Sequence, residues 1–227
     1  MLPMPGRCWL CQIPLMLYQH GICSLCYRHL PQRPISCPRC GLPAGQSHIE
    51  CGRCLLRPPP WHTLVYVSNY QPPLSPLVLR FKFNRITALS VMLARLILLS
   101  WLHARRTRQL PRPDLILAVP LHQRRAWQRG FNQTDMLARK LSHWIGCEYR
   151  PAGLVRVRPS RIQHQLTARA RRKNLHDAFR VEIALRGRHI ALIDDVVTTG
   201  STVDEISRLL MAEGAASIQV WCLCRTL

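Results

Sequence analysis

The sequence predicts an α/β protein in which a mostly parallel sheet carries helices on both faces and a small cysteine-rich module precedes the sheet. Three observations support this prediction. Apolar segments of strand length alternate with segments of helix length from residue 64 onward. The apolar segment 190–193 is followed by two aspartates and then by a Thr-Thr-Gly-Ser-Thr turn. Eight of the eleven cysteines lie within the first 54 residues.

The cysteine-rich start consists of four Cys-x-x-Cys pairs. The pairs are Cys8/Cys11, Cys23/Cys26, Cys37/Cys40 and Cys51/Cys54. Two thiolates at this spacing can reach one tetrahedral ion from a tight turn, so two pairs complete a four-sulfur shell. We therefore expect two structural Zn²⁺ ions, and closed shells of this kind leave no coordination position for catalysis. The spacing leaves open whether the pairs combine sequentially or interleave as a cross-brace.

The competing interpretation of the cysteines is a disulfide framework, which a cytoplasmic location disfavours. The first eight residues lack the basic start and apolar run of a secretory signal, so we expect the protein to be cytoplasmic. We expect the isolated Cys147, Cys222 and Cys224 to be ordinary buried residues. Three successive prolines, residues 58–60, predict a stiff connector between a double zinc ribbon at 1–57 and a larger domain at 61–227.

The larger domain is long enough, and the chain apolar enough at 48% hydrophobic residues, to build a buried core. Strands are expected at 64–70, 115–119, 154–157, 189–193 and 217–224, and helices at 75–83, 85–103, 132–144 and 201–213. The apolar segment 86–102 carries Arg95 at its centre, which favours a helix over the core and argues against membrane insertion. Parallel sheets bind ligands at the carboxyl ends of their strands, so the loops after Val119 and Ile193 are the candidate sites.

The chain is strongly basic, with a formal net charge of +21. Residues 103–188 hold 20 lysines and arginines against 5 acidic residues. The chain has only three lysines beside 29 arginines, a bias that suits bidentate contacts with phosphates. This favours polyanionic partners such as nucleic acid. The alternative is an arginine bias of the genome together with ordinary solvated surface charge.

The turn after the strand 190–193 has the properties of a phosphate site. A glycine lets the backbone approach a ligand closely, and free amides at a helix start bind phosphate. Asp194 and Asp195 would repel a phosphate placed directly on them, so they suit a sugar diol beside it. A phosphorylated ribose satisfies both halves of the turn. The alternative is a turn in which Ser201 or Thr199 merely caps the helix.

The strand, acidic pair and turn resemble the binding motif for phosphoribosyl diphosphate (PRPP) in type I phosphoribosyltransferases. The segment 119–133, together with the cysteine pairs, resembles the ComF/GntX group of phosphoribosyltransferase-like proteins over essentially the whole chain. This resemblance implies PRPP binding with Mg²⁺ and a role in competence or in the use of DNA as a nutrient. The PRPP-binding residues it implies are Val197, Thr198, Thr199, Gly200, Ser201, Thr202, Leu121, His122, Arg124 and Arg125. The catalytic residues it implies are Asp194, Asp195 and Arg129.

The resemblance also implies a reaction, in which a nitrogen nucleophile displaces pyrophosphate from C1 of the ribose. The arginines of segment 120–129 and Mg²⁺ would stabilise the departing pyrophosphate, while the two aspartates hold the ribose hydroxyls. The basic stretch 163–174 corresponds to the mobile loop of the enzymes, although it could equally be a solvated helix face. The hood that selects the base would lie near 61–83, where no residue identifies the acceptor.

A second hypothesis makes the protein a single-stranded DNA-binding protein with a retained PRPP-like pocket. Arginines of the basic segment are interleaved with aromatic residues that could stack on bases, namely Trp127, Phe131, Trp144 and Tyr149. Zinc ribbons also serve as nucleic-acid platforms. DNA-uptake or helicase-type proteins are then expected as partners. The two hypotheses are compatible, since one chain can bind DNA on a basic face and PRPP in the turn.

Overall fold

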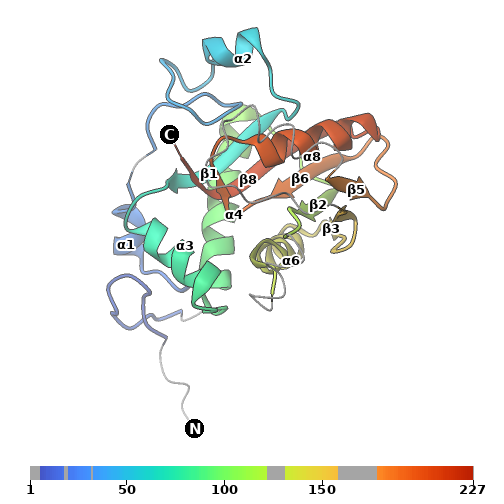
Figure 1. Cartoon of the computed structure of the whole chain (residues 1–227). Coiled ribbons are helices and arrows are strands. Elements are labelled where there is room, and N and C mark those ends of the chain that lie inside the picture. The colour runs from blue at the N-terminus through green and yellow to red at the C-terminus, as the bar shows by residue number, and fades with distance from the viewer. Residues whose placement is uncertain (1–5, 18–19, 32, 122–130, 158–177, 227) are drawn as a thin grey trace, which may run out of the picture.

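A computed structural model describes residues 6–17, 20–31, 33–121, 131–157 and 178–226 (Figure 1). The helices are α1 (Ser24–Arg28), α2 (Gly52–Leu56), α3 (Leu74–Phe83), α4 (Leu89–Arg108), α6 (Gln133–Ile145) and α8 (Ser201–Ala212). The strands are β1 (Thr63–Asn69), β2 (Leu115–Ala118), β3 (Glu148–Tyr149), β4 (Leu154–Arg156), β5 (Phe179–Val181), β6 (His189–Ile193), β7 (Val196–Val197) and β8 (Ser217–Arg225).

Six of the described strands form one sheet in the order β1-β8-β6-β2-β3, with β7 also pairing with β8. Every pairing in this sheet is parallel. The expected α/β class with a parallel sheet is therefore confirmed. The expected strand 154–157 is present as β4, but it pairs antiparallel with β5 in a separate two-stranded sheet.

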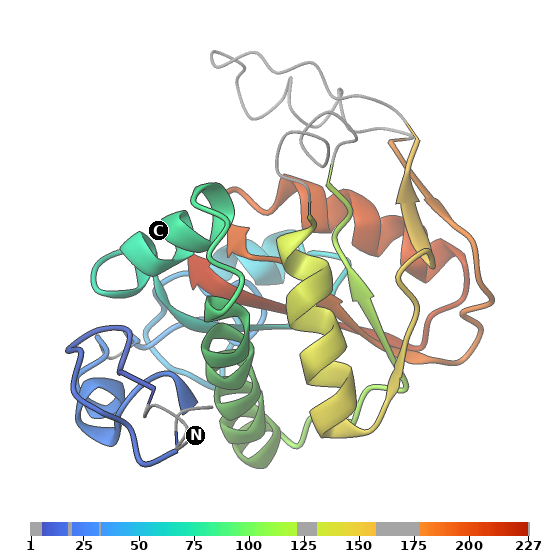
Figure 2. The same ribbon diagram turned by 90° about the horizontal axis from the view of Figure 1, so that it is seen from below.

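Side chains of the central strands alternate between two hydrophobic cores, as the pleat of a strand requires. In β6, Ala191 and Ile193 join the core beneath α3, α4 and α6, whereas Ile190 and Leu192 join the core beneath α8. Figure 2 shows α4 and α6 side by side on one face of the sheet and α8 on the other. Because helices cover both faces of the sheet, a ligand can reach the strands at their carboxyl ends.

The long apolar helix α4 begins at Leu89, later than expected, and ends at Arg108 before the left-handed Gln109. Its buried side chains, among them Leu93 and Ile97, face the core, which agrees with the expectation of a core helix. No helix in the described part of the chain is long and apolar enough to span a membrane.

The cysteine-rich start is a structural duplication. Arg7 bridges Pro14 in the first copy, and Ser36 bridges Pro43 in the second. The Cys8 amide donates to the Ile13 carbonyl at 2.9 Å, and the equivalent bond joins Cys37 to Leu42, also at 2.9 Å. Each copy then ends in a helix of 5 residues, α1 or α2. The two copies are therefore related by a shift of 28 to 29 residues.

The two copies lie on opposite faces of the sheet (Figure 1). The first packs against α4, where a Cβ atom added to Gly21 would lie 2.6 Å from Met92. The second packs on the α8 face of β1, where a Cβ at Gly41 would lie 2.6 Å from Leu64. Arg33, between the copies, donates to the Tyr66 carbonyl of β1 at 2.9 Å. The start of the chain thus wraps around the edge strand β1.

The proline segment 58–60 is held in place rather than free. The guanidinium of Arg39 donates to the carbonyl oxygens of Pro59 at 2.9 Å and of Trp61 at 3.1 Å. The Trp61 indole donates back to the Arg39 carbonyl at 2.7 Å. These contacts attach the prolines to the second cysteine copy. The boundaries at 57 and 61 therefore remain a prediction about folding units.

Candidate functional site

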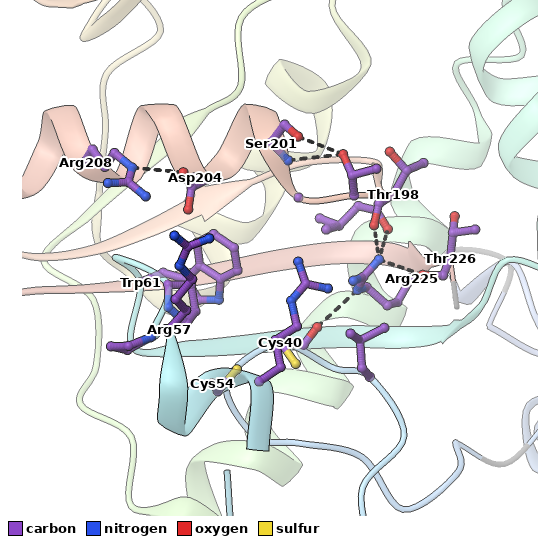
Figure 3. Close-up of a pocket in the computed structure, with 17 residues that line it drawn as sticks. Cys40, Cys54, Arg57, Trp61, Thr198, Ser201, Asp204, Arg208, Arg225 and Thr226 are labelled. Carbon is purple, nitrogen blue, oxygen red and sulfur yellow. Dashed lines mark hydrogen bonds and ion pairs between the residues drawn. The ribbon is translucent and has the colours of Figure 1, made fainter. Parts of the chain in front are cut away.

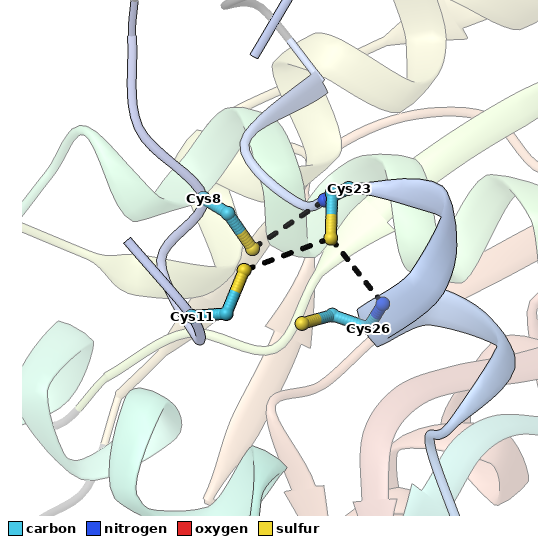
Figure 4. A group of neighbouring side chains, drawn as sticks. All are labelled: Cys8, Cys11, Cys23 and Cys26. Carbon is cyan, nitrogen blue, oxygen red and sulfur yellow. Dashed lines mark hydrogen bonds between the residues drawn. The ribbon is translucent and has the colours of Figure 1, made fainter. Parts of the chain in front are cut away.

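The eight paired cysteines form two groups of four. The first cluster contains Cys8, Cys11, Cys23 and Cys26, and the second contains Cys37, Cys40, Cys51 and Cys54. Within each cluster the sulfur atoms all lie within 4.8 Å of one another (Figure 4). The cysteines therefore combine sequentially, which settles the alternative that their spacing leaves open.

The donor set of each cluster fits a zinc ion. Tetrahedral zinc with Zn–S bonds of about 2.3 Å places its sulfurs about 3.8 Å apart. The Sγ atoms of Cys11 and Cys23 are 3.7 Å apart, and those of Cys40 and Cys51 are 3.6 Å apart. Burial raises the pKa of Cys8, but amide donors that include Cys11 and Cys23 outweigh it and lower this pKa to about 6. The clusters are thus four-thiolate sites suited to structural Zn²⁺.

The acidic pair stands at the carboxyl end of β6. Asp194 accepts a hydrogen bond from the Asp195 amide at 2.8 Å. Burial raises the pKa of Asp194 to about 7, and the negative charge of Asp195 adds to this rise. The Asp195 side chain has a different partner: it forms an ion pair with Lys82 of α3 at 2.8 Å.

Sequence reasoning did not single out Lys82. It lies within the expected hood range 61–83 and is one of only three lysines, but neither fact marks it as a partner of Asp195. The pairing arises because the end of α3 comes close to the end of β6, two elements separated by more than 100 residues. Its side chain is 17% exposed and that of Asp195 is 12% exposed, so the pair is largely shielded from water.

The turn that follows the acidic pair has the geometry of an anion site. We call residues 198–202 the phosphate loop. Gly200 has φ = 81°, a left-handed conformation that favours glycine, and α8 begins directly after it. Gly200, at the N-cap position, has no side chain to cap this helix, and the Ser201 amide donates to the Thr199 hydroxyl at a long 3.4 Å, which leaves the helix start suited to an anionic ligand. The Thr199 hydroxyl lies 2.9 Å from the Ser201 hydroxyl.

Arg225, at the end of β8, supports the phosphate loop from below. Arg225 is 5% exposed, and its guanidinium donates to the carbonyl oxygens of Val197, at 3.1 Å, and Thr198. The same side chain donates to the Cys40 carbonyl at 3.1 Å. Burial lowers the pKa of Arg225. No sequence signal distinguishes this arginine from the other 28, yet it joins the loop to the second cluster.

A cavity of about 880 Å³ lies between the phosphate loop and the second cysteine copy (Figure 3). Its lining residues from the second copy and the prolines are Cys40, Leu42, Arg53, Cys54, Arg57, Pro58, Pro59 and Trp61. Those from the other wall are Val197, Thr198, Thr199, Gly200, Ser201, Asp204, Arg208, Arg225 and Thr226. Four of these residues are arginines, so the cavity suits an anionic ligand.

The structure brings some of the expected site residues together. Asp194, Asp195 and the phosphate loop follow β6, and Leu121 follows the adjacent strand β2. The Val119 amide donates to the Ile193 carbonyl at 2.9 Å, so both loops start from the same edge of the sheet. The expected residues His122, Arg124, Arg125 and Arg129 lie outside the described part of the chain, as does the basic stretch 163–174.

Comparisons with known proteins agree with this geometry. The family model for the phosphoribosyl transferase domain matches residues 128–227. The chain is 55% identical to the DNA utilization protein YhgH of Escherichia coli K12 over 100% of both chains. It is 40% identical to the competence protein F of Haemophilus influenzae over 96% of both chains.

Solved structures show partial likenesses. A structure of adenine phosphoribosyltransferase is 16% identical, with a TM-score of 0.36, and the match covers 57% of this chain and 69% of that one. A structure of the allosteric regulatory enzyme of purine biosynthesis is 17% identical, with a TM-score of 0.38, and the match covers 57% and 24%.

Proposed function

Because the chain belongs to the ComF/GntX family of phosphoribosyltransferase-like competence and DNA utilization proteins, we propose that it binds PRPP together with Mg²⁺ and acts in the use of DNA. One observation carries the proposal. A buried strand ends in two carboxylates, and a short strand and two threonines then lead to a left-handed glycine at the start of a helix. The carboxylates suit the ribose hydroxyls and the helix start suits the 5′-phosphate.

The carboxylates also suit Mg²⁺, which prefers oxygen ligands and is often shared with substrate phosphates. Asp194 is the better candidate to hold the ion, since the ion pair with Lys82 already engages Asp195. Bound Mg²⁺ would neutralise charge on the pyrophosphate. The role that we assign to Lys82 is to hold the Asp195 carboxylate in place, so that its second oxygen accepts from a ribose hydroxyl.

The reaction that this arrangement supports is transfer of the phosphoribosyl group to a nitrogen base. The positive charge that develops on the ribose would be stabilised by the carboxylates, and catalysis would come from positioning and electrostatics. Arg124, Arg125 and Arg129 remain the proposed donors to pyrophosphate. A screen of candidate bases, with pyrophosphate release as the readout, identifies the acceptor base.

Calorimetric titration of PRPP with Mg²⁺ into the zinc-loaded full chain tests the proposal. We expect saturable binding, which the double change Asp194→Ala and Asp195→Ala abolishes. Glu213→Ala, at the exposed far end of α8, is the matched control and should bind as the wild type does. Absence of PRPP binding in the wild type would refute the proposal.

A second function, single-stranded DNA binding, is favoured by the side chain of Trp144, which is 40% exposed on α6 and can stack on a base. The other described aromatic candidates are less available. Phe131 packs against Phe81, with ring centroids 6.1 Å apart, and the Tyr149 hydroxyl donates to Asp135. Trp127 lies outside the described residues.

The test of this second function is affinity for a single-stranded oligonucleotide as a function of salt. An electrostatic site loses affinity steeply as salt rises, because the phosphates release their counterions to solution when arginines replace them. Trp144→Ala should weaken binding about fivefold to a hundredfold, the cost of one lost base stack. A flat salt response would refute the DNA site.

A further inference from the structure

Two arginines of the second cysteine copy line the cavity without any partner among the described residues. Arg53 lies on α2 and Arg57 directly follows it. Both side chains are exposed, and neither forms a hydrogen bond or ion pair within the described part of the chain. The other two arginines of the cavity are engaged, since Arg208 pairs with Asp204 at 2.9 Å and Arg225 holds backbone carbonyls.

The duplication shows that the metal site itself does not require these arginines. Shifted by 28 residues, the positions of Arg53 and Arg57 correspond to Leu25 and His29 in the first copy. Four thiolates around one Zn²⁺ leave the same net negative charge in either copy. Compensation of this charge from these two positions would therefore call for arginines there in both copies. At these positions arginines occur only in the copy that faces the cavity, whereas the arginine of α1, Arg28, corresponds to Leu56 of the second copy.

The size of the cavity sets a limit on its ligand. A volume of about 880 Å³ falls in the upper part of the range for small-molecule pockets. The phosphate loop lines one wall and Arg53 and Arg57 line another, so anion-binding groups lie on two sides of one space. A ligand that uses both walls needs two separate anionic groups.

We propose that Arg53 and Arg57 bind a second phosphate of a nucleotide whose first phosphate lies on the phosphate loop. The proposal rests on the proposed function for the first phosphate and adds the class of ligand. The shared chemistry is a nucleotide with two phosphate groups. It can come from two sources, a free nucleoside 3′,5′-bisphosphate or a 5′-phosphorylated dinucleotide released from DNA.

Calorimetric titration of the zinc-loaded full chain with three probes tests the proposal. The probes are thymidine 5′-monophosphate, thymidine 3′,5′-bisphosphate and 5′-phosphorylated dithymidine. We expect at least one two-phosphate probe to bind more tightly than the monophosphate. Arg53→Ala and Arg57→Ala should each weaken that probe about tenfold, as expected for the loss of a charged hydrogen bond, and leave the monophosphate unchanged. The preferred two-phosphate probe identifies the source.

The control is the double variant Arg28→Ala and Arg106→Ala, which removes the same charge from exposed helix positions outside the cavity. It should bind all probes as the wild type does. Zinc content should be unchanged in this control and in the double variant that combines Arg53→Ala with Arg57→Ala. If the wild type and the Arg53/Arg57 double variant bind the two-phosphate probes equally, the inference is overturned and the proposed function stands. An equal loss in the control variant would also overturn it. Failure of the wild type to bind PRPP would instead refute the proposed function.

Discussion

The guanidinium of Arg225 donates to the carbonyl oxygen of Cys40 at 3.1 Å. Cys40 belongs to the second cysteine cluster, and the same guanidinium donates to Val197 and Thr198 at the start of the phosphate loop. A buried arginine thus connects a cysteine cluster near the start of the chain with the phosphate loop near its end. The two sites should therefore respond to each other.

Loss of metal from the second cluster should weaken PRPP binding. Cys54→Ser removes one of the four sulfurs, so Cys40 and its carbonyl lose their fixed position and Arg225 loses an acceptor. We expect the bound zinc to fall from two ions to one and PRPP affinity to fall about tenfold, by the loss of a charged hydrogen bond that orders the loop. Metal analysis and calorimetry measure the two effects.

The matched control for this prediction is Cys26→Ser in the first cluster, which packs against α4 on the opposite face of the sheet. It should lower the zinc content in the same way and leave PRPP affinity within about twofold of the wild type. An equal loss of affinity in both variants would contradict the connection through Arg225.

Removing the partner of Asp195 should destabilise the protein. Lys82→Met leaves the largely buried Asp195 carboxylate without its ion pair, which costs about 3 kcal/mol of unfolding free energy. Lys82→Arg should restore most of this loss because it keeps the charge. Urea denaturation measures the free energy, with Lys140→Met, on α6, as a lysine control. A Lys82→Met variant as stable as the wild type would show that the ion pair contributes nothing.

Gly200→Ala should impair both stability and ligand binding. At φ = 81° an alanine costs about 1 kcal/mol, and its Cβ would lie 3.4 Å from the Trp61 ring. Gly187→Ala separates the two effects, because Gly187 has φ = 74° but no atom within 4 Å of the added Cβ. Thermal unfolding should show a similar loss for both variants. Only Gly200→Ala should lower PRPP affinity. An equal loss of PRPP affinity in Gly187→Ala would contradict the proposed binding of phosphate at the phosphate loop.

The raised pKa of Asp194 predicts a dependence of stability on pH. Since the folded-state pKa is about 7 and the ordinary value is 3.8, the folded protein holds a proton that the unfolded chain releases between these values. The ionised carboxylate therefore destabilises the fold, fully above pH 7 and not at all near pH 4. Asp194→Asn should stabilise the ligand-free protein by about 2 to 4 kcal/mol at pH 8.

Urea denaturation of Asp194→Asn and of the wild type at pH 4, 6 and 8 checks this sign. The stabilisation should shrink as the pH falls, whereas Glu213→Gln should change stability little at any of these pH values. PRPP binding should show the opposite preference, because the ionised Asp194 carboxylate is the form that holds Mg²⁺. Wild-type affinity should therefore fall as the pH drops below about 7. A gain in stability that is constant with pH would contradict the assignment.

Local patterns carried a large part of the fold and the site. The Cys-x-x-Cys spacing predicts the two four-sulfur groups because a tight turn places both sulfurs of a pair on one side. The apolar segment 190–193 predicts a buried central strand, and the residues after it predict a helix start at Ser201. The two sulfurs of each Cys-x-x-Cys pair, and the residues of the turn, lie within a few positions of one another, so these features are visible in a short window of sequence.

Other features depend on contacts between distant segments. Three features require elements to meet in space. They are the sequential pairing of the cysteines, the position of the two cysteine copies on opposite faces, and the ion pair of Lys82 with Asp195. The expected connector at 58–60 is held by Arg39 for the same reason. A spacing pattern contains no information on which face of a sheet an element covers.

Local sequence patterns were enough to predict the eight clustered cysteines, the α/β class, and the strand, acidic pair and phosphate loop of the candidate site. Periodicity and turn chemistry act over a few residues, and they are sufficient for each of these features. The position of the second cysteine copy as a wall of the cavity, with Arg225 as its link to the loop, depends on the folded chain. It follows from long-range contacts with β1 and β8, among them the hydrogen bonds from the Leu64 amide to the Pro38 carbonyl at 3.1 Å and from Arg225 to the Cys40 carbonyl, and no local motif encodes these contacts.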